Sequence, residues 1–475
     1  MKRLIIIAMM LAAITSQAQL QLNAGLESKA VSADVLEKGT MVGRYDDNSV
    51  WLTAIRHGWR LMALDRDLQV AQAAEMEINA DKLLAATMNG NSATMILLKQ
   101  EKKNTYVMVA HLSLEGESSV DTLAAYNMPG RKDQCLVWGA TSQLGNYMAV
   151  VTVRLFTDSA EYIPTAYLVA PRGNVVYKHE FAMTSIDQIF VTDNGRIVTL
   201  ATDNTEAGVE VMVNYVTSNI TDTSRNSIPC DPLRDIKIVN VVGNRMVAIA
   251  TTSGRGRKGD NACNGMMAMS FDLDSAKVHK CTSQRFTTED INVLYNRYLR
   301  KGVKNLVAEN VSILGCVPTS YGGAMAITRS FEEQTTTNDG IYHHLFQHMG
   351  IHVVGANTEG ELAWVSNIRC HDMQENNGNK LYLGINGDGK NVYIYKTESP
   401  KDSYTYDINR AAKVQKPGKK GNLVRYAILP NGFVEKAVLE RKTKHNFLLV
   451  TANQEIITVR GRKLRRATVS GTQAE

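Results

Sequence analysis

A repeat of short β-strand signals, with a period of about 50 residues, constrains this chain of 475 residues more than any other feature. Each unit contains an apolar strand, a turn with Gly or Asn, a second apolar strand, a variable loop, a third strand, a tight turn and a more polar fourth strand. The first three intervals between units are 52, 50 and 50 residues, and later intervals are longer because loops and a helix are inserted. The first strands begin near Leu84, Leu136, Ile186, Ile236, Val311, Leu381 and Phe447.

The turns between these strands recur at fixed places in the unit. A first set follows the first strand: Asn89-Gly90, Leu144-Gly145, Asn194-Gly195 and Gly243-Asn244. A second set precedes the fourth strand: Glu115-Gly116, Arg172-Gly173, Glu359-Gly360 and Asn431-Gly432. Met148–Val153 is apolar almost throughout, which is typical of a strand that is buried on both faces.

Four strands per unit at this period predict an all-β fold, a β-propeller of about seven four-stranded blades, with eight as the alternative count. Two separate β-sandwiches are the other architecture that the pattern leaves open. Residues 51–56, 59–64 and 68–78 give three strands before the first full unit, and 447–469 gives one or two after the last. A blade completed from both termini would remove an open sheet edge.

One helix is predicted near 287–301. Thr287 is a suitable N-cap, Asp290 lies three residues later, and Gly302 follows the segment. An apolar stripe with helical spacing is formed by Ile291, Leu294, Tyr295, Tyr298 and Leu299. This stripe indicates a helix that packs against its own domain.

The N-terminal residues have the order of a secretory signal peptide. Lys2 and Arg3 precede an apolar run from Leu4 to Ile14, and we expect cleavage after Ala18. The run of about eleven residues is shorter than the roughly 20 that a membrane-spanning helix needs. We therefore expect a signal peptide over 1–18, a lead-in segment over 19–40, a single propeller over 41–469 and a tail over 470–475, exported to the periplasm or the cell exterior.

The charge composition argues against a nucleic-acid partner. The formal charge of +6, from 53 Lys and Arg against 47 Asp and Glu, falls to +4 when Lys2 and Arg3 are removed, so nucleic acid is not an expected partner. Arg460, Arg462, Lys463, Arg465 and Arg466 form a local basic cluster, which we interpret as one charged strand and turn. Residues 399–421 are rich in lysine and predict a solvated loop. We expect a monomer with no membrane-spanning segment.

Six cysteines are present in a chain that we expect to be exported: Cys135, Cys230, Cys263, Cys281, Cys316 and Cys370. Disulfides are permitted in that compartment, and the pair Cys263 and Cys281 could flank one hairpin. The spacing is wide, however, and a chain of this length can bury a sufficient core without disulfides. We predict mostly free, buried thiols.

The titratable clusters predict no metal or cofactor site. His343, His344, His348 and His352 could share a face, but Gly350 interrupts them, and we place the upstream histidines in a hairpin loop before a strand at 351–354. Residues 386–391 lack the acidic ligands of a calcium loop and predict a hairpin turn. Nucleophile-elbow, P-loop and dinucleotide-binding motifs are absent from the sequence.

Carboxylates for glycoside cleavage stay open as an alternative, because their pairing is spatial rather than sequential. The acids on or near first and second strands are Asp187, Asp193, Glu309 and Glu332. No spacing selects among them, so the catalytic residues stay unassigned.

The turn at 354–364 carries the clearest local signature. Gly360 and Trp364 resemble the docking turn of quinoprotein-like propellers, in which the Trp packs between blades and the Gly takes a positive φ. The Asp and Thr of that pattern are missing, so no quinone cofactor is implied. The export signal, the strand sets, the helix before Val311 and this turn together resemble a group of uncharacterised exported β-propeller-like proteins of Gram-negative bacteria. The resemblance implies the fold and no activity.

These observations favour an exported, non-enzymatic propeller that presents loops to a protein or glycan partner at the cell envelope. The alternative is a carbohydrate-active hydrolase or lyase with carboxylates at the channel mouth, and a third class is a structural subunit of an envelope complex. Converging acids with aromatic walls would favour the enzyme, and a face without them would favour binding.

Overall fold

The structure is a computed structural model that describes residues 20–24, 36, 39–130, 132–156, 161–183, 185–206, 208–219, 221–253, 262–297, 306–338, 341–375, 383–403, 409–416, 419–443, 447–450, 455–460 and 463–471. The predicted signal peptide and its cleavage point after Ala18 lie outside this range.

Short β-strands joined by tight turns build antiparallel sheets, because each turn returns the chain alongside the strand that it has just left. Each of the first three sheets contains four strands that are consecutive in sequence. Their strands are β2 (Thr40–Tyr45), β3 (Asn48–Ile55), β4 (Gly58–Leu64), β5 (Val70–Glu77), β6 (Lys82–Asn89), β7 (Ser92–Glu101), β8 (Asn104–Ser113), β9 (Ser118–Asn127), β10 (Gln134–Thr141), β11 (Met148–Phe156), β12 (Glu161–Val169) and β13 (Val175–Glu180).

The next four sheets follow the same order, with one short addition. The strand β22 (Ala308–Glu309) pairs with β20 and extends that sheet. The other strands are β14 (Gln188–Val191), β15 (Ile197–Thr205), β16 (Gly208–Val216), β17 (Thr221–Ile228), β18 (Leu233–Val242), β19 (Arg245–Ser253), β20 (Ala262–Asp272), β21 (Lys277–Arg285), β23 (Val311–Thr319), β24 (Gly322–Asn338), β25 (Ile341–Asn357), β26 (Leu362–Glu375), β27 (Leu383–Gly387), β28 (Val392–Glu398), β29 (Gly421–Ile428) and β30 (Val434–Thr443).

The last sheet joins the two ends of the described chain. Its C-terminal strands are β31 (Phe447–Val450), β32 (Glu455–Arg460) and β33 (Lys463–Gly471), and β1 (Leu20–Ala24) pairs antiparallel with β33. Leu20 lies opposite Gly471, and Ala24 lies opposite Ala467. The segment 19–40, which we expected to be a lead-in, therefore supplies the outer strand of this sheet.

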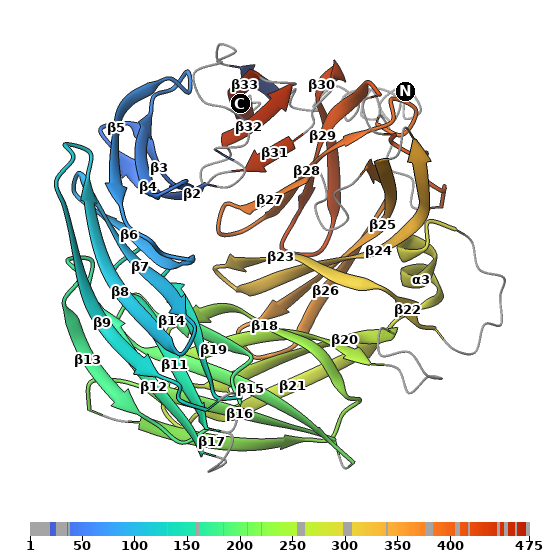
Figure 1. The fold of residues 1–475 in the computed structure, drawn as a ribbon. Coiled ribbons are helices and arrows are strands. Elements are labelled where there is room, and N and C mark those ends of the chain that lie inside the picture. The colour runs from blue at the N-terminus through green and yellow to red at the C-terminus, as the bar shows by residue number, and fades with distance from the viewer. Residues whose placement is uncertain are drawn as a thin grey trace, which may run out of the picture.

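The sheets are arranged as the blades of a ring (Figure 1). The first strands of successive sheets contact one another, as β6 contacts β10 and β18 contacts β23, so these first strands line the centre. The described residues form seven four-stranded sheets and one sheet with the additional β22, eight blades in all. This confirms the predicted all-β propeller, with the blade total at the alternative count. The eighth blade is the sheet β2–β5, in which β2 adds a fourth strand to the three that were predicted over 51–78.

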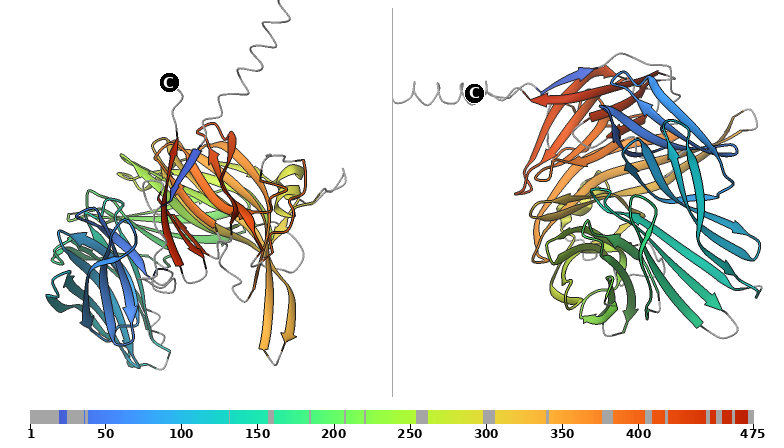
Figure 2. Two further views of the ribbon diagram at one scale, coloured as in Figure 1. Left: turned by 90° about the horizontal axis from the view of Figure 1, so that it is seen from above. Right: turned by 90° about the vertical axis from the view of Figure 1, so that its left-hand side faces the viewer.

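The strand order gives the ring two different faces. Connections from first to second and from third to fourth strands lie on one face, which we call the turn face, and both sets of predicted Gly-containing turns are confirmed there. The opposite face, the insertion face, carries the described connecting residues 286–297, 306–307, 399–403 and 409–416 and the long hairpin of β24 and β25. This hairpin projects well beyond the ring (Figure 2, left).

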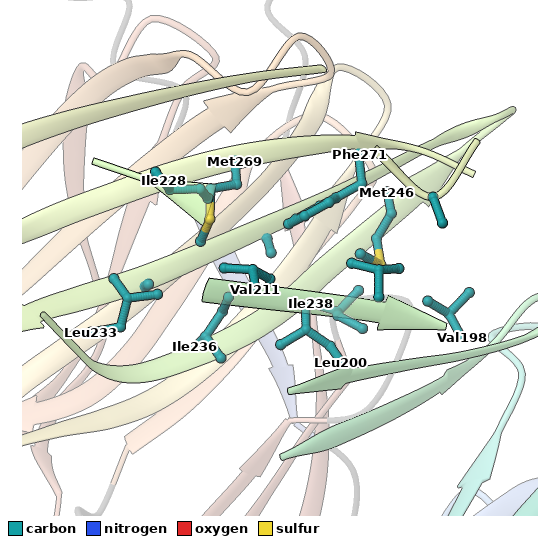
Figure 3. Close-up of a cluster of buried hydrophobic side chains, with 14 of the residues drawn as sticks. Val198, Leu200, Val211, Ile228, Leu233, Ile236, Ile238, Met246, Met269 and Phe271 are labelled. Atoms are coloured by element: carbon teal, nitrogen blue, oxygen red, sulfur yellow. The ribbon is translucent and has the colours of Figure 1, made fainter. Parts of the chain in front are cut away.

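Apolar side chains fill the spaces between adjacent blades. Figure 3 shows one such cluster, between the sheet β14–β17 and the sheet β18–β21. Val211 of β16, Ile236 of β18 and Phe271 of β20 are all buried in it. The last and first blades are joined in the same way, because Ile457 of β32 packs with Trp51 of β3. Each sheet is thus buried on both faces, as the apolar second strands predict.

Hydrogen bonds from buried polar side chains to backbone carbonyls also connect neighbouring blades. Thr87 Oγ1 donates to Gly145 O at 2.8 Å, and Ser366 Oγ donates to Gly432 O at 2.6 Å. Asn240 Nδ2 donates to the carbonyl oxygens of Thr319 and Gly322, at 2.7 and 2.6 Å. These bonds satisfy carbonyl groups of turns that would otherwise be buried without a partner.

The helix α3 (Thr288–Leu294) confirms the predicted N-cap. Thr287 and Asp290 form a capping box, in which the Thr287 hydroxyl accepts from the Asp290 N–H at 3.2 Å and the Asp290 carboxylate accepts from the Thr287 N–H at 2.7 Å. Ile291 and Leu294 are buried against the sheet of β23–β26 and its neighbour, as predicted for a packed helix. The helix ends at Leu294, earlier than predicted, and Tyr298 and Leu299 lie outside the described residues. The helix is not long and apolar enough to cross a membrane, and neither is any other helix in the described residues.

The six cysteines have free thiols, which confirms the prediction. Cys135, Cys263 and Cys370 are buried, and the other three are partly buried. Burial raises the pKa of the Cys370 thiol to about 12 and that of Cys263 to about 11, so both thiols stay protonated and unreactive at neutral pH.

The Gly-to-Trp turn fixes the contact between two blades. Gly360 has φ of 83°, and a Cβ at that position would lie 2.5 Å from the Ser270 nitrogen in the preceding blade. Trp364 is buried and packs over Gly355 of β25 on one side and Gly432 of the following blade on the other. Both features of the docking-turn resemblance are therefore present.

Replacing Trp364 with Ala should leave a cavity between these two blades. We expect Trp364→Ala to lower the free energy of unfolding by about 3–5 kcal/mol, measured by urea denaturation followed by circular dichroism. Phe433→Ala is the control, because Phe433 is 62% exposed on the adjacent turn and should change stability by no more than about 0.5 kcal/mol. Equal losses in the two variants would contradict the role of Trp364 as an inter-blade contact.

Candidate functional site

A cavity of about 570 Å³ lies against the inner wall of the ring, where strands from three blades meet. Its lining comes from the insertion-face half of β18 and β23, together with single residues of β14 and β19. The lining residues are Gln188, Arg234, Asp235, Lys237, Ile238, Thr251, Val311, Ser312, Ile313, Leu314, Gly315 and Cys316. We call this cavity the channel pocket. Its volume falls within the range of about 300–1,000 Å³ that is typical of small-ligand sites.

Two β-bulges shape the channel pocket. The pairing of β18 with β19 shifts between Leu233 and Asp235, which leaves Arg234 as the extra residue. The pairing of β23 with β24 shifts between Ile313 and Gly315, which leaves Leu314 as the extra residue. A bulge redirects the side chain of the extra residue, and bulges are frequent next to binding sites.

The charged side chains of the pocket come from a single strand. Asp235 and Lys237 are two residues apart on β18, so they project from the same face and form an ion pair of 3.4 Å between Oδ1 and Nζ. Arg234 adds a second cation beside them. With two cations and one carboxylate, the described lining has a net charge of +1.

Neutral groups complete the lining. Gln188 Oε1 accepts a hydrogen bond from the Ile238 N–H at 2.7 Å, and this bond fixes the orientation of the Gln188 amide at the junction of β14 and β18. Burial raises the pKa of the Cys316 thiol to about 12, so this residue contributes a neutral, weakly polar surface. The lining contains no aromatic side chain and one carboxylate. The pocket can therefore bind a small polar ligand, but its described walls do not offer the paired acids that glycoside cleavage needs.

The acids considered from the sequence do not converge. Asp187 and Asp193 lie beyond opposite ends of β14: Asp187 accepts the Thr202 N–H at 2.7 Å, and Asp193 accepts the Leu144 N–H at 2.8 Å. Glu309 is exposed on β22, and Glu332 lies on the projecting hairpin. None of these four residues lines the channel pocket.

All four histidines lie on β25, so the predicted strand at 351–354 is confirmed and the predicted placement of the upstream histidines in a hairpin loop is wrong. The strands β24 and β25 are each 17 residues long, and β25 contains the whole cluster. Gly350 does not end the strand, because it forms a bulge with φ of 62° rather than a turn. His348 and His352 are buried, whereas the side chain of His344 is partly exposed. The side chain of His343 lies outside the described part of the structure.

Each described histidine of this cluster has a separate hydrogen-bond partner. His344 Nδ1 lies 2.8 Å from Glu332, and His348 Nδ1 lies 2.7 Å from the Ser330 hydroxyl. In the residues that the structure describes, no group of three or more His, Cys, Asp or Glu side chains is arranged to hold a metal ion.

His352 belongs to a buried network that attaches α3 to the sheet. Its Nδ1 lies 2.8 Å from Asn367 Oδ1, and Asn367 Nδ2 donates to Asp290 Oδ1 at 2.7 Å. The ring of Phe286 packs edge-on against the imidazole. Burial lowers the pKa of His352, although the nearby Asp290 carboxylate opposes this shift. The network thus holds a neutral histidine beneath the helix.

A second polar cluster is buried between β26, β28 and β30. Lys396 Nζ lies 3.2 Å from Asp372 and 3.6 Å from Glu398, and Lys436 Nζ lies 2.7 Å from Glu398. Burial alone would lower the pKa of Lys396, but the two carboxylates raise it, so the ammonium stays charged. These groups pair with one another inside the protein, and we assign them a structural role that links β26 of one blade to β28 and β30 of the next.

Two further segments behave as the sequence predicts. Asp388 closes the hairpin between β27 and β28 by accepting from the N–H groups of Lys390 and Asn391, at 2.9 and 2.7 Å, which confirms a hairpin turn at 386–391.

In the C-terminal basic cluster, Arg465 pairs with Glu440, and Arg466 donates to the Ser49 hydroxyl across the ring closure. These arginines serve contacts within the protein.

No protein-family model and no curated protein sequence matches this chain. Among solved structures, an uncharacterized protein from Listeria monocytogenes EGD-e is similar at 11% identity and a TM-score of 0.34, covering 77% of this chain and 85% of that one. The β-propeller domain of the Trilobed protease from Pyrococcus furiosus shares 9% identity at a TM-score of 0.32, covering 91% and 98%. The polysaccharide lyase Uly1 shares 10% identity at a TM-score of 0.33, covering 83% and 91%. All three scores lie below 0.5, so the fold assignment rests on the sheets of this chain.

Sequence reasoning missed the residues of the channel pocket. Arg234, Asp235 and Lys237 come from one unit of the repeat, Ser312 from the next and Gln188 from the previous one. The available signal was the charge of β18 itself, because its first half contains three charged residues in a strand that lines the centre. That signal indicates a polar sector of the inner wall, but it does not indicate which side chains of the neighbouring first strands face it.

The buried network of His352 should make stability depend on pH. The pKa of His352 is lower in the folded protein than its ordinary value of 6.5, so unfolding takes up a proton at pH values below about 6.5. We expect the free energy of unfolding to fall as pH decreases below 6.5, and this one group can contribute a slope of at most about 1.4 kcal/mol per pH unit. Urea denaturation at pH 7.5, 6.5 and 5.5 measures this pH dependence of the free energy of unfolding. His352→Gln should flatten the slope, whereas His57→Gln, at an exposed turn, should keep it; the same slope in all three proteins would contradict the assignment.

Removing one member of the buried Lys396 cluster should be costly. Lys396→Met leaves Asp372 and Glu398 buried with less compensating charge, and we expect a loss of about 3–5 kcal/mol in the free energy of unfolding. Lys390→Met is the matched control at an exposed turn position, where we expect a change within about 0.5 kcal/mol. A loss in Lys396→Met no larger than in the control would show that the cluster does not stabilise the fold.

Proposed function

We propose that this chain is an exported, non-enzymatic β-propeller binding protein that presents its insertion face and channel pocket to a glycan or protein partner at the cell envelope. The observation that carries the proposal is the position of the channel pocket, which opens at the insertion-face ends of the first strands. A propeller holds such a site rigidly because its blades are fixed by mutual packing, while long connections supply variable contacts around the site.

Export is part of the proposal and rests on the N-terminal sequence. Lys2, Arg3 and the apolar run to Ile14 have the order of a signal peptide. The closing strand β1 begins at Leu20, so cleavage after Ala18 would leave it intact. N-terminal sequencing of the mature protein, purified from cell-envelope and culture fractions, tests this step.

The composition of the pocket favours binding over carbohydrate cleavage. A hydrolase acting through paired carboxylates needs two acids on either side of the scissile bond, and Asp235 is the one acid in the described lining. The Asp235 carboxylate also forms an ion pair with Lys237, at 3.4 Å between Oδ1 and Nζ.

A thermal-shift screen of the purified mature chain against an oligosaccharide panel tests the proposal. A ligand at about 100 times its Kd should stabilise the folded state by roughly 2.7 kcal/mol and raise the melting temperature. Ser312→Trp places a large side chain in the pocket and should abolish the shift, and Ser119→Trp, on the exposed outer strand β9, should retain it. New reducing ends in the panel would contradict a non-enzymatic role. A shift that survives in Ser312→Trp would contradict the pocket as the site.

A further inference from the structure

Charge on the inner wall of the ring is concentrated in one sector. The first strands of the eight blades contain five charged residues in total: Arg44, Lys82, Arg234, Asp235 and Lys237. Three of the five belong to β18 and line the channel pocket. The pocket is therefore set apart from the rest of the wall by its electrostatics as well as by its shape.

Bulges also occur in the first strands of other blades, and β18 has a second bulge at Val239, where its pairing with β19 shifts between Ile238 and Asn240. The pairing shifts in β2 and β6 leave Val42 and Leu84 as the extra residues, and the shift in β23 leaves Leu314. At Leu84 the apolar side chain closes against the next blade, since a Cβ at Gly139 would lie 2.6 Å from Leu84 Cβ. Arg234 is thus the one charged residue among these five bulge positions, and it lines the channel pocket.

The chemistry of the pocket favours a ligand with a negative charge and several hydroxyl groups. The planar guanidinium of Arg234 suits a carboxylate, which it can bind through two parallel hydrogen bonds. Lys237 adds positive charge, and Asp235 beside it can accept hydrogen bonds from ligand hydroxyls. The amide of Gln188 and the hydroxyls of Thr251 and Ser312 supply neutral polar partners, while the apolar Ile313 and Leu314 suit the C–H face of a sugar ring.

We infer that the channel pocket binds the carboxylate-bearing ring of an acidic saccharide, with Arg234 and Lys237 holding the carboxylate. This inference rests on the proposed binding function and specifies its ligand class. The source of the acidic ring is either a free sugar acid or a residue of a longer polyuronate, and both present the same carboxylate to the pocket.

The test is isothermal titration calorimetry of the full mature chain with galacturonic acid, trigalacturonate, galactose and sodium acetate. We expect both uronates to bind, galactose and acetate to bind at least about tenfold more weakly, and uronate affinity to fall as sodium chloride is raised. Tighter binding of trigalacturonate than of the monomer identifies a polymer as the source, and equal binding identifies the free sugar acid.

Substitutions of Arg234 test whether this residue binds the uronate carboxylate. Arg234→Gln should weaken uronate binding at least about tenfold, and Arg234→Lys, which keeps the charge but loses the two-pronged donor geometry, should give an intermediate affinity. Arg225→Gln is the matched control, because Arg225 is 60% exposed on the outer strand β17 and should bind like the wild type. Unchanged melting temperatures of the unliganded variants confirm that folding is intact.

The outcomes separate this inference from the proposed function. Equal binding of galactose and galacturonate, with no effect of Arg234→Gln, would overturn the acidic-saccharide inference and leave glycan binding standing. Binding of acetate as tight as galacturonate would overturn it in favour of a simple anion site. If none of the four ligands binds but a neutral oligosaccharide from the panel shifts the melting curve, the inference fails and the proposed function survives. If none of the four ligands binds in the calorimetry and no oligosaccharide shifts the melting curve, both the inference and a glycan role for the pocket fail.

Discussion

Burial of every sheet on both faces is the constraint on which this structure depends. A sheet such as β10–β13, with its second strand apolar on both sides, needs a neighbour on each side, and a row of such sheets can satisfy its two end members only by closing into a ring. The contact of Ile457 with Trp51 supplies that closure through side chains. The pairing of β1 with β33 gives the closing sheet its fourth strand and ties the N-terminal segment to the C-terminal one.

This constraint explains why the fold was predictable from the sequence. Apolar second and third strands must recur in every blade, so runs such as Met148–Val153 repeat and reveal the period. The tight turns recur because Gly90, Gly145 and Gly195 all have positive φ values that other residues adopt at a cost. The strands β1 and β2 escaped prediction because they are short, and β2 contains a Gly and a bulge that break its alternation.

The candidate site was predictable to a much smaller degree, for a different physical reason. Packing imposes a regular pattern on each blade, whereas the channel pocket depends on residues that approach one another only after three blades are assembled. Gln188, Arg234 and Ser312 lie near the start of successive first strands, but the repeat pattern does not indicate which of their side chains border a common cavity. The histidines illustrate the opposite error: His348 and His352 form a conspicuous pattern in sequence, yet the long hairpin separates them onto individual partners.

A polar sector on an inner wall needs a physical justification, because it weakens the packing that holds the ring together. The ion pair of Asp235 with Lys237 is partly exposed to solvent, so it contributes little stability. Leu84, at the bulge of β6, is apolar and packs directly against the next blade. Natural proteins depart from the locally stable choice mainly where function requires it. The gathering of Arg234, Asp235 and Lys237 beside the channel pocket is such a departure, and the binding of a polar ligand in the pocket would account for it.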